Sequence, residues 1–487
     1  MIVTEDTPKS PVKDDNTPLL GDNRASAPPA YTPPPQAGTS GPTPIVNTQI
    51  PYAVYQPIQP RRSVETAGRR FCKAFLVAIG VWILVSALFG SIFDSGSFSD
   101  YEYHIPEEIA TSHCVTSWSD PMRNPSSSYP HASSTSFTFP VPSETLLLLS
   151  KGGLSGGHLR ITTSEGSDVR VNVQVNYYKD AVRDLARVCM IAREDGELGV
   201  GIFTPQPWRS RSWTDRLSFD VELIIPRSAH VNALSTDVSN FSQDVESLPG
   251  VYFNRLSLKG SNGKINTEEL TAANATLDTS NGSVNAKALV APRAKVTSSN
   301  GGISGSYAVV DSLILHTSNG AIKAAVSITE NSGLQTPKEI TLRTTNNALD
   351  YNLNLGATSA KAENFIIKTT TSNGKLTGQI SSAPLNSVLS IDAQSSNSRA
   401  QLTLPPTYEG RFEVATSNAP VQVLVLKGDQ PDPACEGKRN CKGRQRAVHT
   451  GTVSKRSITG AVHWDKKNGD RCFVNLKSSN GLTTLYL

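Results

Sequence analysis

Four aspartates and one histidine in the second half of the chain are the side chains best suited to acid–base chemistry. Polysaccharide cleavage needs carboxyl groups that converge on one bond, and a metal site needs clustered ligands. His316 stands alone in an expected strand. The aspartates occupy different positions of the repeat described below, so stacked repeats do not align them: Asp278, Asp311, Asp350 and Asp392. We therefore expect no catalytic residue, no metal site and no cofactor, and a β-solenoid enzyme acting on polysaccharide is the least favoured alternative.

A proline-rich motif near the N-terminus has the types and spacing of a protein ligand. Pro28, Pro29 and Tyr31 form a PPxY pattern, in which the prolines pre-set a polyproline II helix and the tyrosine ring is the anchor for a WW domain. A WW-containing ubiquitin ligase bound there would have Lys9 and Lys13 within reach. The alternative is a solvated proline-rich spacer.

Two further patterns in the same region resemble sorting signals. Asp15, Leu19 and Leu20 match an acidic dileucine signal, and Tyr55 with Ile58 matches a tyrosine-based one. Short patterns of this kind also occur by chance. Together with the PPxY motif they favour a second functional hypothesis, a trafficking adaptor that links lumenal cargo to ubiquitin and sorting machinery.

Residues 1–70 contain thirteen of the chain's 31 prolines and no periodic apolar pattern, which predicts a disordered cytosolic tail. Residues 74–93 are uncharged and apolar, and as a helix they would span roughly 30 Å, the thickness of a bilayer core. Basic residues precede this run and acidic residues follow it, which predicts a type II signal-anchor helix over 71–93 with a cytosolic N-terminus and a C-terminal domain outside the cytosol. The implied partner is the lipid bilayer. The sequence leaves open whether this is the plasma membrane or a vacuolar or endosomal membrane.

An internal repeat of nineteen residues dominates the rest of the chain, with four units over 255–330. Each unit has an asparagine at the same repeat position. A leucine or valine stands four residues before it and an isoleucine or valine three residues after it, and both apolar side chains should point into a core. Asn-Gly suits a turn, because both residues tolerate positive φ. The predicted repeat turns are Asn262, Gly263, Asn281, Gly282, Asn300, Gly301, Asn319 and Gly320.

Two packings fit this repeat: a β-solenoid with one rung per repeat, which we favour because like residues recur at a fixed period, and an antiparallel meander of hairpins. Degenerate copies continue toward the C-terminus with looser spacing. The expected fold is therefore an all-β, repetitive, solenoid-like domain. Its predicted parts are a stalk at 94–135, a first β-strand region at 136–250, the repeat domain at 251–426, a loop insert rich in Cys and Lys at 427–456, and closing strands at 457–487.

Cysteine and asparagine positions suggest covalent modifications. Cys435, Cys441 and Cys472 are disulfide candidates, and Cys114 is our guess for the thiol left over. Three Asn-x-Ser/Thr acceptors fit a domain that passes through the secretory route, and they are Asn240, Asn274 and Asn281. A glycan on Asn281 would interrupt the repeat, so Asn240 and Asn274 are the better candidates.

The recurring Ser-Asn-Gly pattern resembles a family of candidate adhesins, domains of unknown function with repetitive β folds in bacterial envelope proteins and in membrane-anchored fungal proteins. The resemblance covers about 140–487, and it departs where Asn347, Ser398 and Ala419 replace the glycine. It implies a surface or envelope role and no catalytic residues. With 46 basic and 42 acidic side chains, nucleic acid is not an expected partner. We therefore expect a non-catalytic, adhesin-like module that presents its β domain to a glycan or protein ligand.

Overall fold

The computed structural model describes residues 73, 75–82, 84–85, 102–140, 144–193, 197–208, 210, 212–227, 229–328, 336–356, 363–425, 431–436 and 443–487. The chain divides into two units, residues 1–96 and 97–487. The predicted tail motifs lie outside the described residues and stay predictions: Lys9, Lys13, Asp15, Leu19, Leu20, Pro28, Pro29, Tyr31, Tyr55 and Ile58.

The predicted membrane helix over 71–93 requires a correction. Within the part of the chain that the structure describes, no helix combines the length and apolar character needed to cross a bilayer. This finding overturns the localisation as a single-pass membrane protein with a cytosolic N-terminus.

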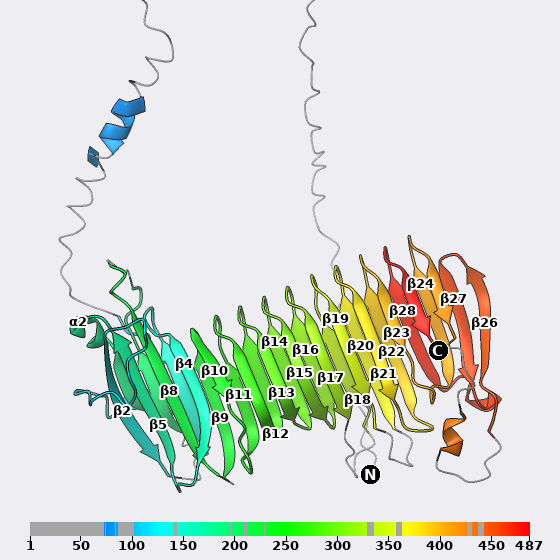
Figure 1. The fold of residues 1–487 in the computed structure, drawn as a ribbon, viewed down its shortest axis with the longest axis horizontal. Helices are drawn as coiled ribbons and strands as arrows, with labels where there is room; N and C mark the ends of the chain where they lie inside the picture. The colour runs from blue at the N-terminus through cyan, green and yellow to red at the C-terminus, as the bar shows by residue number, and fades with distance from the viewer. Residues whose placement is uncertain are drawn as a thin grey trace, which may run out of the picture. The chain divides into compact units, whose positions relative to one another are not determined.

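The second unit is a two-sheeted solenoid of mostly parallel strands (Figure 1). Each repeat contributes one strand to each sheet, and the Ser-Asn-Gly turn connects the two strands. Neighbouring rungs pair in parallel with a register shift of nineteen residues, for example Leu277 with Val296 and Val284 with Ile303. The structure therefore confirms the solenoid-like fold and excludes the antiparallel meander for the repeats.

Sheet A continues through both ends of the solenoid, with antiparallel pairs at its two ends and parallel pairs between them. Its strands in spatial order are β1 (Ile109–Ser112), β6 (Arg187–Arg193), β7 (Glu197–Phe203), β3 (Thr145–Lys151), β9 (His230–Val238), β11 (Tyr252–Lys259), the second half of β12 (Ile265–Thr279), β14 (Arg293–Ser298), β16 (Ser312–Thr317), β18 (Lys338–Arg343), β20 (Asn364–Thr371), β22 (Val388–Ser395), β28 (Cys472–Ser478), β24 (Gly410–Thr416), β27 (Ser457–His463) and β26 (Ala447–Ser454).

Sheet B faces sheet A and is joined to it through β12. Its strands in spatial order are β2 (His131–Phe139), β5 (Val169–Tyr177), β8 (Leu217–Pro226), β4 (Gly157–Ser164), β10 (Phe241–Val245), the first half of β12, β13 (Val284–Val290), β15 (Ile303–Val309), β17 (Ile322–Ile328), β19 (Leu349–Asn354), β21 (Leu376–Ser382), β23 (Ala400–Thr403), β29 (Thr483–Tyr486) and β25 (Val421–Leu424).

The two apolar columns predicted from the repeat form the core between the sheets. Every member is at most 1% exposed, and the members are Leu258, Leu277, Val296, Leu315, Ile265, Val284, Ile303 and Ile322. Successive side chains of a strand point to opposite faces, so one residue type at a fixed repeat position becomes one continuous buried row. Burial of each such side chain contributes about 1.5–3 kcal/mol. The predicted inward orientation of both columns is confirmed.

The glycine of each repeat turn is required by close stacking and not by positive φ. None of the repeat-turn residues is among the described positions with positive φ, which differs from our expectation. Instead, a Cβ on Gly282 would lie 1.9 Å from the carbonyl oxygen of Gly263, and a Cβ on Gly301 would lie 1.9 Å from that of Gly282. Each turn therefore sits directly on the backbone of the turn before it.

Two columns of polar side chains follow this stack of turns. Ten asparagine side chains along one edge are joined by nine Nδ2–Oδ1 hydrogen bonds of 2.6–2.7 Å. Beneath them, from Asn281 onward, a Ser or Thr two residues before each asparagine donates to a carbonyl of the neighbouring turn, as Thr317 does to Gly301 at 2.9 Å. The asparagines in spatial order are Asn240, Asn262, Asn281, Asn300, Asn319, Asn346, Asn373, Asn397, Asn480 and Asn418.

The longer repeats differ from the others in the connections at the edge of the solenoid opposite the asparagines. Asn319, Asn346 and Asn373 are spaced by 27 residues, and the extra residues fall between β17 and β18 and between β19 and β20. Both connections join sheet B to the next strand of sheet A, on the edge away from the asparagines. The irregular spacing therefore leaves the stack of Asn turns unbroken.

Both ends of the solenoid contain a rung that is out of sequence order. β28 and β29 lie between rung β22/β23 and rung β24/β25. Likewise β3 and β4 lie between rung β7/β8 and rung β9/β10.

The predicted stalk and disulfides also differ from the structure. β1 and the start of β2 fall within 94–135 and pair with β6 and β5, so this stretch packs on the domain. Cys114 is bonded to Cys189 and is not the free thiol. Among the described cysteines, Cys472 is free and buried, and it lies in the inserted strand β28. Cys435 takes part in a disulfide, and Cys441 lies outside the described residues.

Gly263→Ala tests the stacking constraint against Gly260→Ala in the same turn. A Cβ at position 263 would lie 1.7 Å from the carbonyl oxygen of Phe241, whereas a Cβ at position 260 would be 3.5 Å from its nearest neighbour. We expect Gly263→Ala to lower the free energy of unfolding by about 1–3 kcal/mol and Gly260→Ala to leave it nearly unchanged. Urea unfolding followed by circular dichroism measures both. Similar losses for the two variants would show that the stacking argument is wrong.

Ile303→Asp tests the buried rows against Lys323→Asp. Ile303 is buried in the core and Lys323 is exposed on the next rung of sheet B. A carboxylate at position 303 would lack a partner, so we expect a loss of several kcal/mol there and little change at position 323. Thermal unfolding of the two variants provides the comparison, and equal melting temperatures would contradict the assignment of inside and outside.

Candidate functional site

The acids considered for catalysis do not converge in the structure. Asp278 and Asp392 lie in different strands of sheet A, Asp350 lies in sheet B, and Asp311 pairs with Arg293 at 3.1 Å. The Asp278 carboxylate accepts from Thr297, and the Asp392 carboxylate accepts from Gln394 and Asn475 at 2.9 Å. Among the described residues, no group of three His, Cys, Asp or Glu side chains could hold a metal ion.

The three candidate glycosylation asparagines differ in their contacts. Asn240 and Asn281 belong to the asparagine column, and the Nδ2 atom of each is already a donor, to Ser155 at 3.2 Å and to Asn262 at 2.7 Å. Asn274 is exposed on β12, outside the column, and its Nδ2 atom has a long contact of 3.5 Å to Asn254. Asn274 is therefore the acceptor most compatible with the folded solenoid, and its modification stays a prediction.

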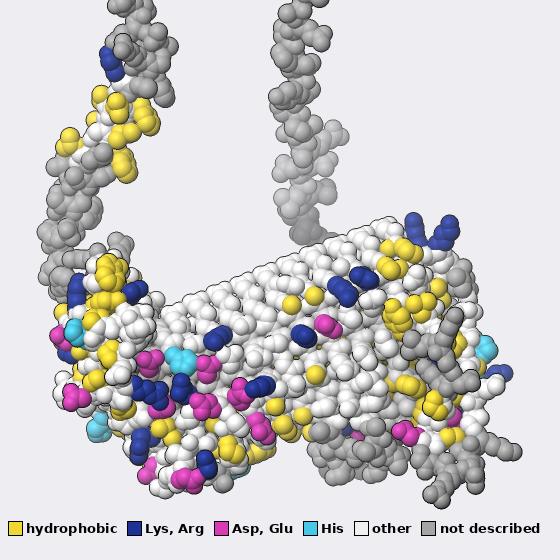
Figure 2. All heavy atoms as spheres, viewed as in Figure 1, with side chains coloured by type: hydrophobic (Ala, Val, Ile, Leu, Met, Phe, Trp, Pro, Cys, Tyr) yellow, Lys and Arg dark blue, Asp and Glu magenta, His cyan; other side chains and the backbone are white. Residues whose placement is uncertain are grey.

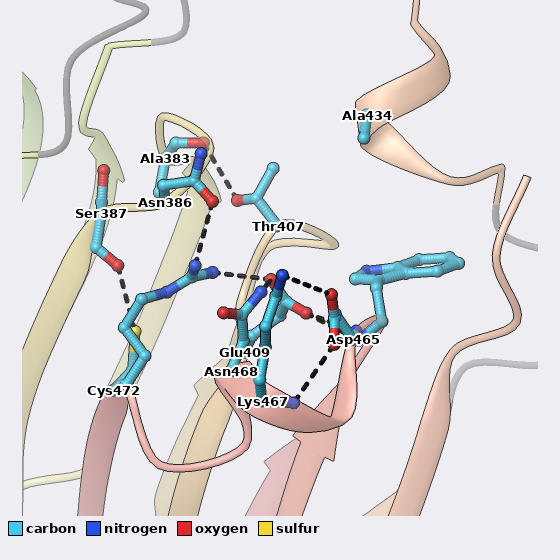
Figure 3. Close-up of polar contacts among 12 residues, drawn as sticks. Ala383, Asn386, Ser387, Thr407, Glu409, Ala434, Asp465, Lys467, Asn468 and Cys472 are labelled. Carbon is cyan, nitrogen blue, oxygen red and sulfur yellow. Dashed lines mark hydrogen bonds and ion pairs between the residues drawn. The ribbon is translucent and has the colours of Figure 1, made fainter. Parts of the chain in front are cut away.

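A buried carboxylate near the C-terminal end has a complete set of partners (Figure 3). Glu409 is 5% exposed and accepts hydrogen bonds from the backbone of Trp464 and Asp465 at 2.8 and 2.9 Å. Its other oxygen accepts from Asn468 at 3.0 Å and from Arg471 at 2.6 Å. A carboxylate whose acceptor positions are filled by its own chain is a structural anchor and not a general base.

The same network holds the inserted strand β28. Arg471 also donates to Asn386 at 3.0 Å, and the Cys472 thiol donates to the carbonyl of Ser387 at 3.3 Å. Burial raises the pKa of the Cys472 thiol, so it stays protonated at neutral pH. These contacts join the segment before β28 to the turns that flank rungs β22/β23 and β24/β25.

The strongest candidate for ligand contact is an aromatic–arginine cluster at the other end, formed by Tyr129, Tyr178, Trp213 and Arg216. The rings of Tyr178 and Trp213 meet edge to face with centroids 4.9 Å apart, and Tyr129 and Tyr178 lie 5.3 Å apart. The Arg216 guanidinium lies 5.5–5.6 Å from all three ring centroids. Trp213 is nevertheless 68% exposed, so a large apolar ring is held in place while facing solvent.

The antiparallel end of sheet B brings these residues together. In β2–β5–β8, the register places His131 beside Tyr177 and Tyr177 beside Leu217. The start of β2, the end of β5 and the start of β8 therefore meet at one edge. Residues just outside these strand ends, 129, 178 and 213–216, become neighbours although they are far apart in sequence.

The loop that carries Trp213 and Arg216 is tied to the domain on both sides. Trp208 donates from Nε1 to the carbonyl of Asp215 at 3.2 Å, and the Asp215 carboxylate pairs with Lys179 at 2.7 Å. The Tyr178 hydroxyl donates to the carbonyl of Ser128, and Arg216 donates to that hydroxyl at 3.5 Å. Burial raises the pKa of Tyr129, against the effect of Arg216, so its ring stays neutral at physiological pH.

A polar cavity of about 490 Å³ lies near the same strand ends, since Tyr177, the last residue of β5, lines the cavity and the next residue, Tyr178, belongs to the cluster. Its wall includes Trp118, Ser133 and Arg183. The Tyr177 hydroxyl lies 3.1 Å from both Ser133 and Arg183, and the Arg183 guanidinium lies 5.0 Å from the Tyr177 ring centroid. The volume and the mix of aromatic and hydroxyl groups suit a small polar ligand.

The face drawn in Figure 2 shows charged side chains gathered over the strands near β8–β11 and few over the middle of the solenoid.

Sequence reasoning missed both the aromatic cluster and the Ser/Thr column. The Ser/Thr column was visible in the sequence, because every copy from Thr279 onward has Ser or Thr two residues before the asparagine. The cluster left only a weak signal in the sequence, an aromatic or arginine residue near the end of each of three strands.

Glu409→Ala should destabilise the domain, because it leaves Arg471 buried without its carboxylate. The two side chains are 6% and 16% exposed, and breaking such a buried pair costs about 3–5 kcal/mol. Arg411→Ala is the control, since the Arg411–Asp470 pair is 63% and 71% exposed, and we expect no measurable change there. Chemical unfolding monitored by tryptophan fluorescence compares them. A Glu409→Ala variant as stable as Arg411→Ala would contradict the anchoring role.

Residues 293–425, less than a third of the chain, match the domain of unknown function DUF7330. No curated protein matches the chain. Among solved structures, the chain is similar to a candidate cell adhesion protein from Clostridium sporogenes ATCC 15579, with 9% identity, a TM-score of 0.17, and coverage of 72% of this chain and 99% of that one. It is also similar to a candidate adhesin from Bacteroides fragilis NCTC 9343, with 14% identity, a TM-score of 0.30, and coverage of 50% and 96%.

Proposed function

We propose that the solenoid is a non-catalytic, adhesin-like binding domain whose ligand is a glycan held at the aromatic–arginine cluster. The observation that carries this proposal is the exposed Trp213 ring, which Tyr178 and Arg216 hold in place. An aromatic ring that is already ordered loses little conformational entropy when a ligand binds. It can stack against the apolar C–H face of a sugar ring while neighbouring polar groups bind hydroxyls.

The surroundings of the cluster favour a sugar over a flat protein surface. The cavity lined by Tyr177, the residue before Tyr178, also contains hydroxyl groups, Trp118 and the Arg183 guanidinium in its wall. Arg183 forms ion pairs with Asp180 and Asp184 at 2.8 Å, so its charge is locally balanced. A neutral ligand with many hydroxyl groups fits such a cavity, because it can accept and donate hydrogen bonds without bringing a charge.

Trp213→Ala is the variant that tests this proposal, with Phe473→Ala as the matched control. Both rings are exposed, and Phe473 lies on sheet A at the opposite end, 46% exposed. On an array of immobilised neutral oligosaccharides, we expect the full chain to bind a subset and Trp213→Ala to bind that subset at least tenfold more weakly, because a central aromatic contact contributes about 2 kcal/mol. Phe473→Ala should bind as the unchanged chain does.

The melting temperature separates loss of contact from loss of fold. Because Trp213 is mostly exposed, we expect Trp213→Ala to melt within a few degrees of the unchanged chain. Equal weakening by Trp213→Ala and Phe473→Ala, or no oligosaccharide bound by the unchanged chain, would overturn the proposal.

A further inference from the structure

The outer face of sheet A carries two parallel rows of exposed and half-buried side chains across four adjacent strands, β14, β16, β18 and β20. Parallel register places one residue of each strand beside the next, so the rows run along the solenoid. One row is Lys295, Ile314, Thr341 and Lys368, and the other is Thr297, His316, Arg343 and Thr370. We call Lys295, Arg343 and Lys368 the cationic face, and His316 lies among them.

The cationic face differs from its surroundings in its ion pairs. On either side of it along the solenoid, sheet A side chains pair with acids: Lys259 with Asp237 at 3.8 Å, and Lys477 with Glu413 at 3.1 Å. Among the described residues, Lys295, Arg343 and Lys368 make no ion pair within 4 Å.

The acids closest in register are directed elsewhere. Asp392 is the register neighbour of Lys368, but its carboxylate is bonded to Gln394 and Asn475. Asp278 precedes Thr297 in the other row and accepts from its hydroxyl. Glu339 lies four residues before Arg343 on β18, beyond Thr341. The three cations of the face therefore have acids near them in register but form no ion pair with any described residue.

The pKa of His316 reflects the positive charges near it. Burial lowers its pKa first, and the charges of Arg343 and Lys295 lower it further. Cations that repel one another across a rigid sheet gain energy when an anionic ligand lies over them.

We propose that the cationic face binds an acidic polysaccharide that lies across the strands, along the solenoid axis. Neighbouring strands are about 4.8 Å apart, so Lys295 and Lys368 are separated by about 14 Å and a ligand must be extended to reach both. Exposed Ile314 and the hydroxyls of Thr341 and Thr370 supply apolar and polar contacts between the charges. This site is separate from the aromatic–arginine cluster and does not depend on it.

Nucleic acid fits this face less well. Neither row contains a Phe, Tyr or Trp ring on which a base could stack, and the formal net charge of the chain is only +4. The face is an open parallel sheet with short threonine side chains between the cations, and a chain of hydroxylated, carboxylated or sulfated rings can contact both kinds of group.

Charge reversal tests the proposal on the full chain, with heparin and polygalacturonate as probes and neutral dextran and duplex DNA as comparisons. We expect heparin and polygalacturonate to bind at low salt, with affinity that falls as salt rises. Lys295→Glu with Arg343→Glu should weaken binding at least tenfold. The matched control is Lys287→Glu with Lys323→Glu, the same charge change on exposed lysines of sheet B, which should change the affinity less than threefold.

Two further measurements distinguish the cationic face from the aromatic–arginine cluster. Trp213→Ala should retain heparin binding, and the Lys295/Arg343 double variant should retain neutral oligosaccharide binding and the melting temperature of the unchanged chain. Equal losses in the two double variants would show a general charge effect and overturn the proposal. It would equally be overturned by tighter binding of duplex DNA than of heparin, or by no heparin binding at low salt.

Discussion

The contact of each turn with the turn beneath it is the constraint on which the whole solenoid depends. A Cβ on Gly320 would lie 2.0 Å from the carbonyl oxygen of Gly301, so this approach leaves no room for a side chain. At that separation, the asparagine amides are within 2.7 Å of one another and the buried hydroxyls reach the carbonyls. The turns thereby set one rung spacing for both sheets, which aligns the apolar rows. At Asn347, Ser398 and Ala419 a side chain replaces glycine, so the constraint is relaxed at single rungs without loss of the asparagine column.

The sequence was sufficient to predict the repeat, the inward columns and an all-β solenoid-like fold, because these follow from period and alternation alone. It was not sufficient for features that depend on distant segments. Asn-Gly fits both a positive-φ turn and a close approach between backbones, and only the neighbouring rung distinguishes them. Cys435 and Cys472 are near each other in sequence, yet Cys472 belongs to a strand inserted between other rungs. The apolar run at 74–93 satisfied a length criterion, whereas no helix in the described part of the chain is long and apolar enough to cross a bilayer.

The two proposed binding surfaces have different origins in the fold. The cationic face is a product of regular stacking, since parallel register turns single lysine and arginine residues of separate repeats into one surface. The aromatic–arginine cluster arises where the repeat stops and antiparallel strand ends bring residues 129, 178 and 213–216 together. Repeat analysis could in principle have found the first surface by aligning the outward positions. The second required the tertiary pairing of β2, β5 and β8, which no local pattern specifies.

The inserted rungs change how the domain would respond to mechanical force. A simple stack of rungs can peel from its last strand, one ladder at a time. Here β28 and β29 each have a parallel partner on both edges, and Arg471 clamps the segment before β28. Tension applied at Leu487 would load two ladders per sheet in shear, and both must rupture before the strand slides free. The solenoid should therefore resist extension from this end strongly and rupture in a single large step, without progressive loss of one strand after another.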